Sequence, residues 1–80
     1  MSSNGKRKSG IITAKQIVKK FSISFQTVNH YTNLGLLTVL TKEGNVRLYS
    51  ETKVRERLSK IAKLVSEGYS LGLIRKKLTG

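Results

Sequence analysis

Few side chains in this sequence have the chemistry that covalent catalysis needs. The 80 residues include one histidine, four glutamates, and no cysteine or aspartate. No Ser-His-acid set, carboxylate pair or metal cluster can be assembled from them, and Gly68 and Gly72 do not form a phosphate-binding loop after a strand. The sequence therefore predicts that the chain is not an enzyme and holds no metal or other cofactor.

Recognition chemistry is available instead, in a polar group that would share the outer face of one helix. The group consists of Gln26, Thr27, Asn29 and His30. Asparagine and glutamine can each form two hydrogen bonds with adenine, and a threonine methyl group can contact that of thymine. An ordinary solvated face is the alternative explanation. We expect direct base contact from at least one of Gln26, Asn29 and His30.

The charge of the chain favours a polyanionic partner. Sixteen lysines and arginines oppose four glutamates, giving a net charge of +12 with histidine neutral, and the first 42 residues contain no acid. A field of one sign attracts polyanions and raises their rate of encounter. Nucleic acid is the first candidate, an anionic membrane the second, and a merely solubilising charged surface the third.

Two helices must position the polar group. Residues 1–10 are small, polar and basic, which predicts a disordered tail. A capping box of Thr13 and Gln16 then predicts a helix to residue 21, with an apolar face of Ala14, Ile17, Val18 and Phe21. After a short turn, a second helix is expected over residues 25–34, with Ser24 as its N-cap and Gly35 just past its end.

The second helix would turn Phe25 and Val28 inward. Two helices separated by about three residues are the signature of a helix-turn-helix. The Phe25 and Phe21 rings are both expected to be buried, which would leave the polar group as the exposed face of this unit.

The segment from residue 36 to residue 50 alternates like a hairpin. Its turn contains Gly44 and Asn45, one of which should have a positive φ. If Val46 and Leu48 face the core, Arg47 points outward, where it can reach a phosphate. Tyr49 shares the Arg47 side by simple alternation, and we expect it to pack under the hairpin with its hydroxyl bonded to backbone or phosphate. Lys42 and Asn45 at the tip are minor candidates.

Two further helices complete the expected order. Ser50 and Glu51 suit the start of a third helix, and Gly68 ends it. Its apolar stripe comprises Val54, Leu58, Ile61, Ala62 and Val65. Ser70 begins a fourth, with an inward face of Leu71, Ile74 and Leu78. The predicted fold is mainly α with a small β-hairpin, a winged helix-turn-helix over residues 11–80 in the order helix, helix, wing, helix, helix.

Four segments in this order resemble the N-terminal DNA-binding domain of the MerR family of bacterial regulators. The strongest is residues 44–51 (GNVRLYSE), which is similar to the family's wing and third-helix start. The others are residues 27–31 (TVNHY), residues 34–37 (LGLL) and residues 67–71 (EGYSL). The resemblance covers most of the chain, from Ile12 to Leu78.

The resemblance implies that helix 25–34 enters the major groove and that the wing, about residues 38–49, contacts the flanking backbone. It also implies backbone contacts from Tyr31 and Arg47. Asn29 stands where the family usually has arginine, and His30 where it has its first aromatic residue, so site preference should differ. The chain reaches Gly80 without the family's dimerisation helix or effector domain, which predicts no small-molecule effector site in it and either an isolated domain of a longer protein or a minimal relative.

We therefore expect a sequence-specific double-stranded-DNA-binding domain of a bacterial transcription regulator. Its expected DNA-contacting residues are Ser24, Gln26, Thr27, Asn29, His30, Tyr31, Lys42, Asn45, Arg47 and Tyr49, with Lys20, Lys60 and Lys63 as additional candidates for backbone contacts. The free chain should be a cytoplasmic, nucleoid-associated monomer that can bind DNA in several copies.

An excisionase-like architectural DNA-binding protein is the alternative function. An RNA-binding module is less favoured, because such modules usually expose aromatic side chains for stacking and this chain has five aromatic residues in all. A membrane-surface role is disfavoured, because each apolar stripe has a partner within the expected fold.

Overall fold

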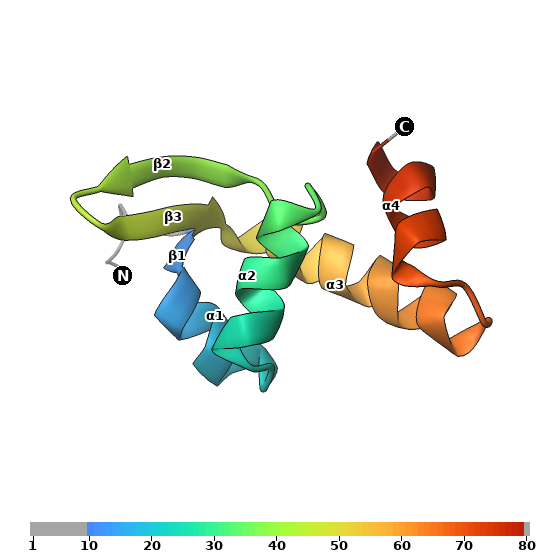
Figure 1. Cartoon of the computed structure of the whole chain (residues 1–80). Coiled ribbons are helices and arrows are strands. Elements are labelled where there is room, and N and C mark those ends of the chain that lie inside the picture. The colour runs from blue at the N-terminus through green and yellow to red at the C-terminus, as the bar shows by residue number, and fades with distance from the viewer. Residues whose placement is uncertain (1–9, 80) are drawn as a thin grey trace.

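The computed structural model describes residues 10–79, which form four helices and one small sheet. The elements run in the order β1 (Ile11–Thr13), α1 (Ala14–Phe21), α2 (Phe25–Asn33), β2 (Val39–Glu43), β3 (Val46–Ser50), α3 (Glu51–Ser66) and α4 (Leu71–Thr79). Figure 1 shows the β2–β3 hairpin extending to one side of α1 and α2, with α3 leading away from it toward α4. This confirms the predicted winged helix-turn-helix. The tail expected over residues 1–10 lies, apart from Gly10, outside the described residues.

Side-chain caps fix where the helices begin, as predicted. The Thr13 hydroxyl accepts from the Gln16 amide at 3.1 Å, and the Thr13 amide donates to the Gln16 side chain at 2.9 Å, which completes the capping box of α1. Ser50 accepts from the Lys53 amide at the start of α3. Helix ends are equally local, since Gly35 and Gly68 have φ of 81° and 95° just beyond α2 and α3.

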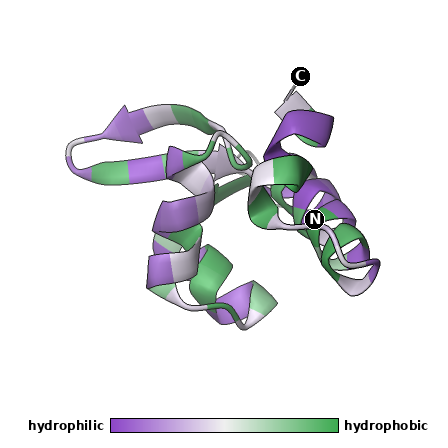
Figure 2. Cartoon of the chain, turned by 45° about the vertical axis from the view of Figure 1, so that its right-hand side comes forward, coloured by the Kyte–Doolittle hydropathy of each residue, from purple (hydrophilic) through white to green (hydrophobic). Residues whose placement is uncertain are grey.

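Strand β1 is an element that the sequence did not predict. It pairs antiparallel with β3, so the strand order in the sheet is β1-β3-β2 and the hairpin is the larger part of a three-stranded sheet. Ile12 faces Tyr49 across this pairing. The hairpin turn has Gly44 at φ 62°, as expected for one of its two central residues. In Figure 2, hydrophobic and hydrophilic residues alternate along β3, whereas β2 is hydrophobic at its start and hydrophilic at its end.

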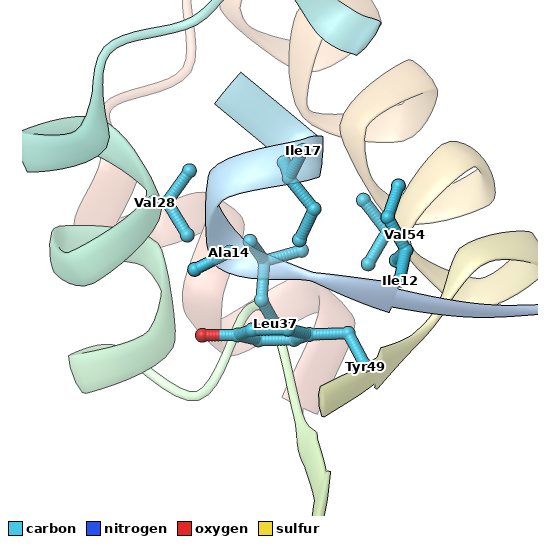
Figure 3. Packing of buried hydrophobic residues seen from close by; sticks show 7 residues of the cluster. All are labelled: Ile12, Ala14, Ile17, Val28, Leu37, Tyr49 and Val54. Carbon is cyan, nitrogen blue, oxygen red and sulfur yellow. The ribbon is translucent and has the colours of Figure 1, made fainter. Parts of the chain in front are cut away.

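The main core lies where α1, α2, the sheet and the start of α3 meet. Its buried members are Ile12, Ala14, Ile17, Val28, Leu37, Tyr49 and Val54 (Figure 3). They come from five of the seven elements and from the segment before β2. Burying them together therefore sets the angle between the two helices and the hairpin.

A second, smaller core attaches α4 to the rest of the fold. Leu36, Ile61 and Ile74 are buried there, and Tyr31 and Leu58 contact both cores. Two arginines reinforce the attachment: Arg75 Nε donates to the Leu34 carbonyl at 3.0 Å, and Arg57 donates to the Leu78 carbonyl at 3.2 Å. The first of these bonds places a cation at the C-terminal end of α2, where the helix dipole favours it.

Several side chains do not lie where the sequence predicted. Phe25 is 53% exposed rather than buried, because it occupies the first position of α2 and points away from the core. On α3 the exposed pair is Ala62 and Val65, whereas Leu64 packs against the second core. The Leu64 side of α3 packs toward α4. The apolar spacing within α3 alone does not show where α4 lies.

Candidate nucleic-acid interface

The turn between α1 and α2 positions the first residues of α2. Ser22 adopts a left-handed conformation (φ 56°, ψ 42°) that ends α1. Ser24 then caps α2: its hydroxyl accepts from the Thr27 amide at 3.0 Å and lies 2.8 Å from the Thr27 hydroxyl. Both side chains are thereby engaged in holding the helix start, which orients the residues beside them.

Of the four polar side chains expected on the outer face of α2, Gln26 and His30 are exposed, and Thr27 and Asn29 are half-buried. Asn29 lies against the wing, and Tyr31 packs between the two cores. The structure therefore leaves Gln26 and His30 accessible on α2, while Asn29 is accessible only in part.

A hydrogen bond joins α2 to the wing. The Arg47 guanidinium on β3 donates to the side-chain oxygen of Asn29. Arg47 therefore does not point outward as expected, and Val46, predicted to face the core, is 48% exposed. The large Tyr49 ring takes the core position on β3, and alternation then brings Arg47 to the same side.

Tyr49 is fully buried, as its size suggested, and its hydroxyl has a different partner from those expected. It lies 2.9 Å from the Thr32 hydroxyl, which also donates to the Val28 carbonyl at 2.7 Å. Figure 3 shows the Tyr49 ring spanning the core with its hydroxyl toward α2. Tyr49 thus gives β3 a second link to α2, in addition to the Arg47–Asn29 bond.

The tip of the wing is open. Lys42 and Asn45 are both exposed on either side of the turn at Gly44. Lys42 pairs with Arg47 across the hairpin, and the Arg47–Asn29 bond joins this part of the wing to α2.

The three lysines expected as additional backbone contacts lie on α1 and α3. Lys20, on α1, pairs with Glu51 at the start of α3, and Arg55 donates to the same carboxylate at 3.0 Å. The hydrogen bond from Lys20 is the main cause that lowers the pKa of the Glu51 carboxyl; Arg55 acts in the same direction and partial burial opposes both. Lys60 and Lys63 are exposed in the C-terminal half of α3, and Figure 1 shows that α3 leads away from the wing.

A groove between the wing and the starts of α1 and α2 brings in residues that the sequence did not single out. Its volume is about 620 Å³. The lining residues are Thr13, Ala14, Lys15, Phe25, Asn45, Val46 and Arg47. We call this the wing groove. The groove exists because α1, α2 and the wing, which are far apart in sequence, come together here, and Lys15 of α1 lies at its edge.

The comparisons with known proteins agree with this geometry. A family model described as MerR HTH family regulatory protein matches residues 12–80. No curated protein and no solved structure matches the chain. Within residues 10–79, none of the helices has the length and apolar character needed to cross a bilayer.

Proposed function

The chain belongs to the MerR HTH family of regulatory proteins, and we propose that it reads double-stranded DNA with α2 in the major groove and the wing on the adjacent backbone. Family membership establishes a DNA-binding transcription-regulator domain. The assignment of α2 and the wing to their places on the duplex, and the preference for particular sequences, are our proposal.

The observation that carries the proposal is the hydrogen bond between Arg47 and Asn29. It ties the helix that would read bases to the strand that would contact phosphates, so the two are presented as one surface. Base edges in the major groove are recognised by side chains on the first turns of such a helix. Gln26 and His30 are exposed there, and Asn29 keeps its amide NH2 group as a donor while its oxygen accepts from Arg47.

Backbone contacts would come from the basic wing. Lys42 and Asn45 are exposed at its tip, and Arg47 can contact a phosphate through the guanidinium nitrogens that do not bond Asn29. Such contacts fix register and orientation but carry no sequence information directly. Affinity should therefore have a strong salt dependence.

The test is selection from a random duplex library, followed by anisotropy titrations with the selected duplex, a scrambled duplex, the matching RNA duplex and anionic vesicles. We expect tight binding to the selected DNA only. Equal affinity for selected and scrambled DNA, together with strong bending of both, would support an architectural role instead. Preference for RNA or vesicles would contradict the proposal.

A further inference from the structure

The wing groove has an apolar floor that the fold itself leaves uncovered. Phe25 is 53% exposed and Val46 is 48% exposed, and both line the groove beside Ala14. They belong to different elements: Phe25 opens α2, and Val46 opens β3. A phenylalanine at this exposure forgoes much of the stabilisation that burial would provide, so a partner that covers it would gain that free energy.

The rim of the groove indicates what that partner is. Lys15 and Arg47 supply two cations, Thr13 and Asn45 supply polar groups, and no carboxylate is among the lining residues. A peptide with acidic residues could satisfy such a rim, but the groove is continuous with the α2 face through Arg47, which contacts Asn29. A duplex placed on α2 would thus lie across the groove as well.

We propose that the wing groove receives the C5-methyl group of a thymine, with Phe25 as the main contact and Val46 as the second. This inference rests on the proposed function, because it requires α2 in the major groove. The thymine methyl is the apolar feature of that groove, and phenylalanine is among the side chains that contact it. Phe25 is then a specificity-determining residue that favours T·A pairs at one end of the site.

The experiment uses the full chain and the duplex selected above, in two forms: with thymidine, and with deoxyuridine replacing every thymidine. Deoxyuridine keeps the Watson–Crick pairing and lacks the methyl group. The wild type is compared with Phe25→Ala, with Phe25→Leu, and with Leu73→Ala as a matched control, because Leu73 is 52% exposed on α4 outside the groove.

The wild type and Leu73→Ala should bind the thymidine duplex about fourfold more tightly for each methyl contacted, as expected for burial of one methyl group. Phe25→Ala should lose this preference by binding the thymidine form more weakly, and Phe25→Leu should retain part of it. Circular dichroism spectra that match the wild type show that each variant is folded.

Four results would overturn the inference. Equal affinity of the wild type for the two duplexes refutes the methyl contact while leaving DNA binding intact. Undiminished discrimination by Phe25→Ala moves the contact to another residue. A free protein that is dimeric until Phe25 is replaced would show that the groove holds a second copy. Failure of the wild type to bind any selected duplex refutes the proposed function, and this inference with it.

Discussion

The Arg47 guanidinium has two roles in our proposal, and a double-mutant cycle separates them. It would contact a phosphate, and it holds the side chain of Asn29. We expect Arg47→Ala to weaken binding to all duplexes and to lower the slope of log affinity against log salt by about one unit. Asn29→Ala should cost about 1–3 kcal/mol on the preferred duplex and much less on a scrambled one.

The two substitutions should not be additive. Because the residues share a hydrogen bond, the coupling free energy on the preferred duplex should be at least about 0.5 kcal/mol. Lys42→Ala is the control, since Lys42 is exposed at the wing tip and should add to Asn29→Ala without coupling. Additive losses from Arg47 and Asn29 would mean that the contact between them does not survive on DNA.

Tyr49 illustrates a residue whose effect on binding should be indirect. Its ring is fully buried and its hydroxyl bonds that of Thr32, so we expect Tyr49→Phe to destabilise the fold by about 0.5–1.5 kcal/mol. Affinity for the selected duplex should be unchanged at temperatures where the variant is folded. Thermal melts and anisotropy titrations measure the two effects, and a large loss of affinity in a stable variant would return Tyr49 to the DNA-contacting set.

At the scale of elements, Glu51 joins α1 to the start of α3. Its carboxylate lies in the first turn of α3, where the helix dipole favours negative charge, and it pairs with Lys20 and Arg55. Glu51→Gln should therefore lower the free energy of unfolding at pH 7 by up to about 1 kcal/mol, which is a fall in Tm of about 4–8 °C at most.

The pH dependence of this difference has a definite sign. The pKa of Glu51 is lowered in the folded chain, so its contribution is present above the ordinary pKa of a glutamate and is lost as the pH falls through the folded value. Melts of wild type and Glu51→Gln should converge in acid. Glu56→Gln, an exposed substitution on the same helix with the same charge change, should show little difference at either pH.

The elements that the sequence predicted well are those whose causes are local. Thr13, Ser24 and Ser50 cap helices through residues three positions away, and Gly35 and Gly68 end them through their own backbone. Such signals can be read without knowing the fold. The order and approximate bounds of the helices followed from them.

The features that the sequence missed depend on contacts between distant segments. Strand β1 exists because residues 11–13 pair with residues 48–50. Strand β3 keeps its alternation, but Tyr49 occupies the core side, so Arg47 on the same side turns inward to Asn29 while Val46 turns outward. The wing groove, with Phe25 exposed, arises from the same arrangement and could not be foreseen from any one segment.

At the scale of the whole molecule, charge and the use of apolar surface set the oligomeric state. A net charge of +12 on 80 residues makes free chains repel one another. On α3, the longest helix, Val54 and Ile61 are already buried within the fold, and Leu58 packs against both cores. The apolar residues left exposed on that helix, chiefly Val65, are too few to offset the repulsion.

We therefore predict that the free chain is a monomer at micromolar concentration and that copies associate only on DNA, where phosphates neutralise their charge. Light scattering at moderate salt should give a mass near 8.9 kDa without DNA. Titration with duplexes of increasing length should then add copies one at a time, with no requirement for a two-fold symmetric site. Val65→Ser should leave the mass unchanged, because this side chain is not needed for a contact between free chains. A mass near twice 8.9 kDa that Val65→Ser restores to the monomer value would instead identify the exposed face of α3 as a dimer interface, and the DNA site would then be expected to have two symmetric halves.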